Sequence, residues 1–202
     1  MILTPTKTEV LEELRDKRIY VDTSFWMAYG TRPLIRKKAE AEEDSMEALR
    51  VRFLEGIERG DYTVLTSTLA EMEYAVNIAQ LVSEEKVQKG LGLATADEVK
   101  ERTDRLGYTW DELGVKVGRV TEISYGSRVE SGTFLEWSHE VSRLSTCAVN
   151  QGKPPKLNHL GMADAMHVRL AECMGADFIL TEDMPFEGLR NTPIRPVVLM
   201  PG

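Results

Sequence analysis

Cysteine is scarce in this chain of 202 residues, which contains only Cys147 and Cys173. Two cysteines this far apart exclude a disulfide-rich scaffold and a Cys-x-x-Cys metal site. Both fall in apolar helical patterns, which predicts two reduced thiols buried as small hydrophobic groups. No apolar run reaches membrane-spanning length, and residues 1–18 carry charges throughout, without the apolar segment of a signal peptide. We therefore expect a soluble, cytoplasmic protein.

Basic residues are also in the minority, with 25 Lys and Arg against 33 Asp and Glu, which gives a net charge of −8. This balance argues against a broadly basic surface that coats nucleic acid, although basic residues can still cluster beside a metal site. The length and the hydrophobic content of 42% predict one compact domain with a substantial core.

Short apolar runs typical of strands alternate with amphipathic helical patterns. We expect strands at 19–22, 62–66, 178–181 and 196–200, and helices at 41–58, 69–82 and 162–174. This alternation predicts an α/β fold of three layers, α/β/α, with a mostly parallel central sheet. The whole chain, 1–202, is expected to form a single domain with a leading helix within 1–18. Alternation stops at about 84–157, where Thr-x-x-Glu capping boxes at 95–98, 109–112 and 133–136 predict a helical insertion.

Four acidic residues lie where these elements begin or end. Asp22 and Asp183 follow expected strands, whereas Glu71 and Asp164 lie in the first turns of expected helices. Ligands of parallel sheets gather outside the carboxyl ends of the strands, so these acids are placed to converge. Converging carboxylates repel one another and are costly to desolvate, and a divalent cation reverses both effects. We therefore predict a metal site at this edge of the sheet.

Each acid also has a purely structural interpretation. Glu71 completes a Thr68–Glu71 capping box, Asp22 and Asp164 can cap the helices beside them, and Asp183 suits a turn.

Four segments, in this order, resemble the PIN-domain family of metal-dependent nucleases, which includes VapC-like toxin ribonucleases. They are Val21-Asp22-Thr23-Ser24, Thr68-Leu69-Ala70-Glu71-Met72, the helix that begins Ala163-Asp164-Ala165, and the stretch 175–183. The resemblance covers roughly residues 19–82 and 160–199, and it implies a PIN-like version of the three-layer fold.

The resemblance also implies a set of site residues. Asp22, Asp164 and Asp183 would lie around Mg²⁺ or Mn²⁺, Glu71 would complete the acidic ring, and Ser24 and Thr181 would support it. Pro185 stands where many members carry a further acid, so the number of metal ions stays open. The same resemblance implies a homodimer, an RNA substrate and a place for an antitoxin partner.

Oxygen ligands without a nearby Cys or His at metal-ligand spacing favour a hard cation such as Mg²⁺ or Mn²⁺. His159 and His167 flank Asp164, and we assign neither of them a ligand role. The predicted function is a metal-dependent endoribonuclease in which a metal-activated water attacks the phosphodiester. Candidate substrate-binding residues are Arg32, Arg36, Lys37, Lys38, Lys153 and Lys156.

Two other functions stay open. The first is a non-catalytic PIN-like module for RNA binding or assembly, whose acids serve only as helix caps. The second is a metal-dependent phosphatase with Asp22 as nucleophile, which usually has a second Asp two residues further on, where this chain has Ser24.

Overall fold

A computed structural model describes residues 2–3, 9–29, 45–119, 146–148, 156–158, 160–189 and 191–200. Its central feature is a six-stranded sheet in the order β1-β8-β7-β2-β3-β4, in which every neighbouring pair of strands is parallel. The strands are β1 (Ile2–Leu3), β2 (Arg18–Val21), β3 (Thr63–Ser67), β4 (Lys116–Gly118), β7 (Phe178–Thr181) and β8 (Arg195–Leu199).

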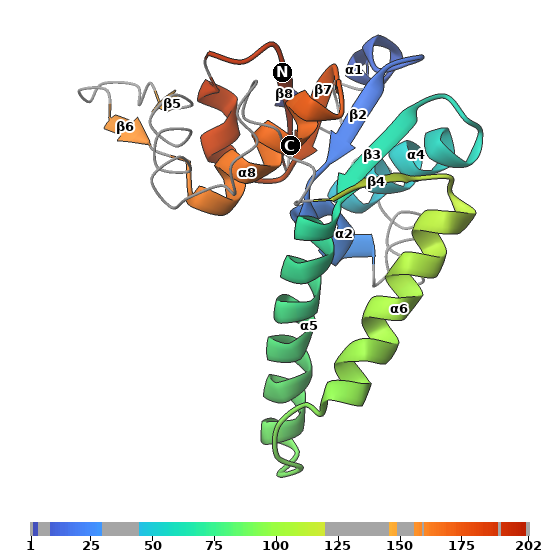
Figure 1. Ribbon diagram of the computed structural model, residues 1–202, viewed down its shortest axis with the longest axis vertical. Coiled ribbons are helices and arrows are strands. Elements are labelled where there is room, and N and C mark those ends of the chain that lie inside the picture. The colour runs from blue at the N-terminus through green and yellow to red at the C-terminus, as the bar shows by residue number, and fades with distance from the viewer. Residues whose placement is uncertain are drawn as a thin grey trace.

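Helices cover both faces of this sheet (Figure 1). They are α1 (Glu9–Glu13), α2 (Thr23–Tyr29), α4 (Met46–Glu58), α5 (Thr68–Gln88), α6 (Ala96–Glu112), α8 (Met162–Cys173) and the 3-10 helix η2 (Met184–Gly188). A separate antiparallel pair is formed by β5 (Thr146–Ala148) and β6 (Lys156–Asn158). The three-layer α/β/α fold with a parallel central sheet, predicted from the alternation of elements, is confirmed.

Two hydrophobic cores lie on opposite faces of the sheet because side chains alternate along each strand. In β2, Ile19 and Val21 enter the core that contains residues of α2, α4, α5 and α6, whereas Tyr20 enters the core beneath α8. In β7, Leu180 and Ile179 divide in the same way. Burial on both faces explains why these strands are continuous apolar runs rather than alternating patterns.

The tryptophans Trp26 and Trp110 join α2 to α6. Their exposed fractions are 0% and 3%, and their ring centroids lie 5.5 Å apart in an edge-on arrangement. The indole N–H of Trp26 donates to the Thr66 hydroxyl of β3 at 3.2 Å. The hydrogen bond joins α2 to β3, and the contact between Trp26 and Trp110 holds α6 against α2.

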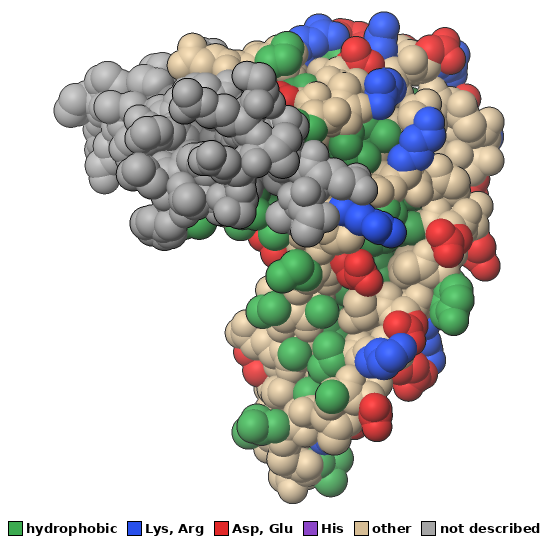
Figure 2. Space-filling model, in the orientation of Figure 1, with side chains coloured by type: hydrophobic (Ala, Val, Ile, Leu, Met, Phe, Trp, Pro, Cys, Tyr) green, Lys and Arg blue, Asp and Glu red, His purple; other side chains and the backbone are tan. Residues whose placement is uncertain are grey.

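Helices α5 and α6 pack side by side and project from the sheet as a hairpin (Figure 1). Hydrophobic side chains are visible along its surface (Figure 2). Within α5, Met72 and Val76 are 63% and 68% exposed. Both side chains lie outside the hydrophobic cores. The residues of α5 that enter the core are Leu69, Ala70, Tyr74, Ile78 and Val82.

The stretch expected to be a helical insertion also contributes to the sheet. The capping box at Thr95 and Glu98 is confirmed at the start of α6. Thr109 starts no helix, because it lies within α6 and its hydroxyl donates to the Arg105 carbonyl at 3.0 Å. After α6 the chain forms β4, which pairs with β3 at the sheet edge, so the alternation continues through residue 118.

Cys173 is exposed, contrary to the prediction of a buried thiol. It is the last residue of α8, whose buried positions are Ala165, His167, Val168, Leu170 and Ala171, and it lies off that face. Among the described residues, no helix combines the length and the hydropathy needed to cross a membrane.

Candidate metal centre

The carboxyl ends of β2 and β7 meet at one edge of the sheet, where Val21 lies opposite Leu180. Asp22 is the first residue after β2, and Asp183 is the second residue after β7. A cavity of about 510 Å³ opens at this edge. It is lined by four acids, two hydroxyl residues and one side of α5: Asp22, Asp164, Asp183, Glu73, Thr23, Ser24, Leu69, Met72, Val76 and Asn77.

Asp22 is the buried acid of this cavity, with 4% of its surface exposed. Its Oδ1 accepts the Thr23 amide at 2.7 Å. Its Oδ2 accepts the hydroxyls of Ser24 at 3.2 Å and Thr181 at 2.8 Å. Ser24 and Thr181, the two hydroxyl residues named from the sequence, thus orient the Asp22 carboxylate.

Asp183 lines the same cavity and is exposed to solvent. Partial burial, followed by the negative charges of Asp22 and Asp164, raises the pKa of the Asp183 carboxyl to about 6. Its backbone amide donates to the Thr181 hydroxyl at 3.0 Å, which fixes the turn after β7. Burial is the larger cause of this raised pKa, and the neighbouring carboxylates add to it.

Glu182, next to Asp183, does not line the cavity. Arg50 of α4 holds its carboxylate in a two-pronged ion pair of 2.8 and 2.6 Å. The Glu182 amide also donates to the Ser24 hydroxyl at 3.1 Å. These contacts leave Asp183 as the acid of this turn that faces the cavity.

Asp164 combines the two roles that its sequence position allowed. Its Oδ2 accepts the Gly161 amide at 2.9 Å, so it caps α8, and its side chain also lines the cavity. Burial raises the pKa of the Asp164 carboxyl, and the charge of Asp22 adds to this, while the Gly161 amide works in the opposite direction. Asp22, Asp164 and Asp183 are therefore brought together, as the sequence predicted.

Glu71, the fourth predicted acid, is exposed and does not line the cavity. The reason is the start of α5, since the Ser67 hydroxyl, and not Thr68, caps the helix by accepting the Ala70 amide at 3.4 Å. The side of α5 that faces the cavity contains positions 69, 72, 73, 76 and 77, a helical stripe that excludes position 71. Glu73 therefore occupies the place that we had expected for Glu71.

Glu73 reaches the other site residues from the second turn of α5. Its Oε2 accepts the Thr23 hydroxyl at 2.5 Å and lies 2.8 Å from the His167 Nε2 atom. Burial alone would raise the pKa of Glu73, but the hydrogen bonds from His167 and Thr23 reverse this and lower it. Glu73 is thus an ionised acid within the cluster.

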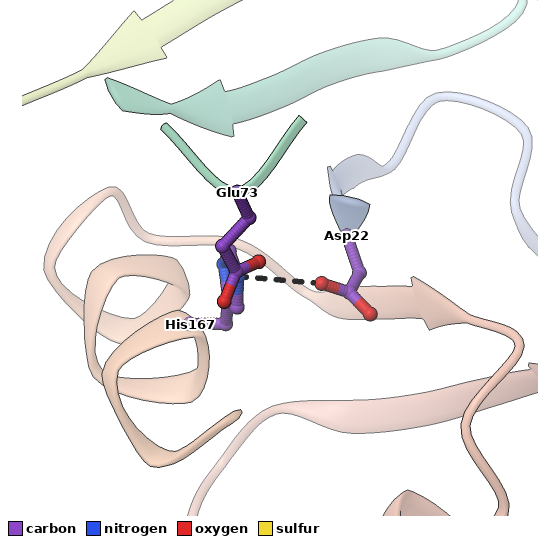
Figure 3. A group of neighbouring side chains, drawn as sticks. All are labelled: Asp22, Glu73 and His167. Carbon is purple, nitrogen blue, oxygen red and sulfur yellow. Dashed lines mark hydrogen bonds and ion pairs between the residues drawn. The ribbon is translucent and has the colours of Figure 1, made fainter. Parts of the chain in front are cut away.

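His167, to which we had given no ligand role, contacts both Glu73 and Asp22, and the dashed line in Figure 3 marks its ion pair with Asp22. Its Nε2 atom is 3.4 Å from Asp22 Oδ1. Burial works to lower the imidazole pKa, but the Glu73 hydrogen bond and the charges of Asp22 and Glu73 outweigh it, so the pKa is raised. One signal in the sequence indicated this placement, because His167 follows Asp164 by three residues and shares its helix face.

The donor atoms suit a divalent cation. One ligand atom each from Asp22, Glu73 and His167 lies within 4.8 Å of the other two. Asp164 and Asp183 add two carboxylates to the same cavity. Carboxylate oxygens are ligands for Mg²⁺ and Mn²⁺. The charges of Asp22 and Asp164 contribute to the raised pKa of Asp183, and a bound cation would offset their repulsion.

The predicted substrate-binding residues cannot be placed around this cavity. Arg32, Arg36, Lys37, Lys38 and Lys153 lie outside the described residues, and of Lys156 only the backbone is described, in β6.

No protein-family model matches this chain, and no curated protein does so either. Six chains of solved structures match it. One is described as a domain of a functionally unknown protein from Methanocaldococcus jannaschii DSM 2661; the match has 21% sequence identity, covers 84% of this chain and 80% of that one, and has a TM-score of 0.31. This similarity is too low to transfer a function to the present protein.

Proposed function

We propose that this protein is a Mg²⁺- or Mn²⁺-dependent endoribonuclease that hydrolyses phosphodiester bonds. The observation that supports this most is the convergence of Asp22, Glu73, Asp164 and Asp183 on one cavity from four separate segments of the chain. The RNA substrate, the homodimer and the antitoxin partner rest on the resemblance to PIN-domain nucleases, and the cytoplasmic location rests on the composition of the chain. We retain all four as parts of the proposal.

Each acid that lines the cavity has a role in the proposed reaction. Asp22, held by three hydrogen bonds, would be the main metal ligand, with Asp164 and Asp183 completing the carboxylate set. A bound cation supplies Lewis acidity, which lowers the pKa of a water nucleophile and neutralises charge on the phosphate. Glu73, ionised and hydrogen-bonded by Thr23, would add a further carboxylate to the ligands of that cation.

The arrangement of α5 offers a matched test, because Glu71 and Glu73 belong to the same helix. Glu73→Gln is expected to lower the rate of RNA cleavage about 100-fold, since it removes an acid that lines the cavity. Glu71→Gln changes an exposed residue outside the cavity and is expected to stay within about twofold of the wild-type rate. Fluorogenic RNA substrates with Mn²⁺ would report both rates, and a chelator should abolish cleavage in every variant.

The double variant Asp22→Asn with Asp183→Asn tests the centre as a whole. Cleavage by the wild-type protein that persists in this variant at an unchanged rate would rule out the proposed site. Equal losses in Glu71→Gln and Glu73→Gln would instead contradict the placement of Glu73.

A non-catalytic module remains the second candidate, because some contacts of the acids are structural. Asp164 caps α8 through the Gly161 amide, and Asp22 is satisfied by donors within the protein. Calorimetric titration distinguishes the two functions. Mn²⁺ binding that is lost in Asp164→Asn supports the enzyme, whereas RNA binding without any metal binding supports the module.

A further inference from the structure

The imidazole of His167 connects the acidic cavity to a buried chain of hydrogen bonds. Its exposed fraction is 1%. On one side, Nδ1 shares a hydrogen bond of 2.7 Å with the Tyr20 hydroxyl, which in turn lies 2.6 Å from the Ser67 hydroxyl. All three residues are fully buried, so the ring is held in one orientation.

The other ring nitrogen, Nε2, points toward the carboxylates (Figure 3). It lies 2.8 Å from Glu73 Oε2 and 3.4 Å from Asp22 Oδ1. Two adjacent ligands of an octahedral cation, each about 2.1 Å from the metal, are about 3 Å apart. The nitrogen is therefore spaced from each of the two oxygens as neighbouring ligands of a single ion are, and all three atoms lie within 4.8 Å of one another.

We propose that His167 Nε2 binds the metal ion directly, together with Asp22 and Glu73, and that this nitrogen ligand makes the centre prefer Mn²⁺ over Mg²⁺. The inference rests on the metal of the proposed function and specifies its coordination. Mg²⁺ takes carboxylate, carbonyl and water oxygens, whereas Mn²⁺, which shares these oxygen ligands but is a transition metal, also accepts an imidazole nitrogen. A nitrogen ligand therefore favours Mn²⁺ over Mg²⁺.

Tyr20 and Ser67 have a defined part in this centre. A histidine that binds a metal usually has its second nitrogen hydrogen-bonded, which fixes the ring and its tautomer. Tyr20 is that partner for Nδ1, and Ser67 holds the Tyr20 hydroxyl in place. Tyr20 does not line the cavity and acts through His167, so it is a positioning residue rather than a catalytic one.

The same contacts would also be made by a histidine that only hydrogen-bonds Glu73. Pulsed electron paramagnetic resonance of the full-length protein, loaded with one equivalent of Mn²⁺, separates the two cases because it detects ¹⁴N bound to manganese. We expect a ¹⁴N coupling typical of imidazole in the wild type. The chain has two further histidines, and the variant His139→Gln with His159→Gln should retain the coupling, whereas His167→Gln should lose it.

Titration calorimetry then tests the preference. In His167→Gln, the affinity for Mn²⁺ should fall by at least about tenfold while the affinity for Mg²⁺ changes much less. Tyr20→Phe keeps the imidazole, so its ¹⁴N coupling should persist, with an Mn²⁺ affinity about tenfold weaker. Tyr20→Phe and the wild type carry the test if His167→Gln does not fold.

Mn²⁺ bound without ¹⁴N coupling in the wild type would overturn this inference while leaving the nuclease proposal intact. A coupling that disappears in the His139 and His159 variant would overturn it as well, as would the failure of Mn²⁺ to bind. Conversely, ¹⁴N coupling from His167 in a protein that cleaves no RNA would support the metal centre and reject the proposed function.

Discussion

At the level of single residues, Asp183 carries the clearest electrostatic strain in the cavity. Its pKa is raised from the usual 3.8 to about 6 by partial burial and by Asp22 and Asp164. A carboxyl with a raised pKa stabilises the fold below its unfolded pKa, and this contribution is lost as the pH rises through the folded pKa. In the metal-free protein, the charged Asp183 therefore disfavours folding above about pH 6.

Asp183→Asn should consequently raise the free energy of unfolding at pH 8 in the presence of a chelator, and leave it nearly unchanged at pH 4. The full rise in pKa would correspond to ~3 kcal/mol in a buried group, and solvent screening at this exposed side chain reduces the expected gain to about 1 kcal/mol. Urea unfolding at the two pH values measures it. With saturating Mn²⁺ the sign should reverse, because the variant lacks a ligand; a gain of equal size at both pH values would contradict this account.

The sequence predicted Asp22, Asp164 and Asp183 because each is tied to a strand end or a helix start, and strand ends of a parallel sheet share one edge. Glu73 and His167 were missed for a different reason. Both lie inside helices, where the direction of a side chain depends on the rotation of the helix against its neighbours. In α5, apolar residues occur on more than one side, and the pattern could not tell the core from the cavity wall.

At the level of elements, the start of α5 couples a helix cap to the candidate metal centre. Ser67 ends β3, caps α5 through the Ala70 amide and also bonds the Tyr20 hydroxyl. Thr95 caps α6 in a capping box on the hairpin, with no link to the centre. The two caps thus differ in burial and in the hydrogen bond to Tyr20, which only Ser67 makes.

Ser67→Ala should lower the free energy of unfolding by about 2 kcal/mol, since a lost cap costs about 1 kcal/mol and a lost buried hydrogen bond about as much again. Thr95→Ala, the matched control, should cost about 1 kcal/mol. Urea unfolding compares them, and calorimetry should show weaker Mn²⁺ binding only in Ser67→Ala. Equal effects of the two substitutions on both quantities would show that Ser67 acts as a cap alone.

Helices and strands could be predicted from the sequence where an apolar pattern was long or was bounded by a turn residue. β7 was expected at the residues where it lies, because a run of four buried apolar or small residues follows the turn at Gly175. β4 was not expected, since it has three residues, of which only Gly118 is buried. The start of α5 differs from the expected one because Ser67 and Thr68 can both cap a helix. Ser67, the last residue of β3 and paired with Gly118 of β4, is the residue that caps it.

At the level of the whole molecule, the centre connects segments that are remote in sequence. Asp22 follows β2, Glu73 belongs to α5, Asp164 to α8, and Asp183 follows β7. A cation held by these acids would bind the folded chain far better than the unfolded one, where the acids are dispersed. Metal binding should therefore stabilise the entire fold.

At a Mn²⁺ concentration of about 100 times its dissociation constant, the expected gain is about 2.7 kcal/mol, which corresponds to a rise in Tm of about 5–10 °C for a chain of this size. Differential scanning calorimetry measures the rise against KCl at equal ionic strength, which controls for screening of the net charge of −8. Asp22→Asn should remove most of the rise, because Asp22 is the buried acid nearest the other ligands. A wild-type Tm that responds equally to Mn²⁺ and to KCl would mean that the four acids hold no cation, and that their convergence belongs to the fold alone.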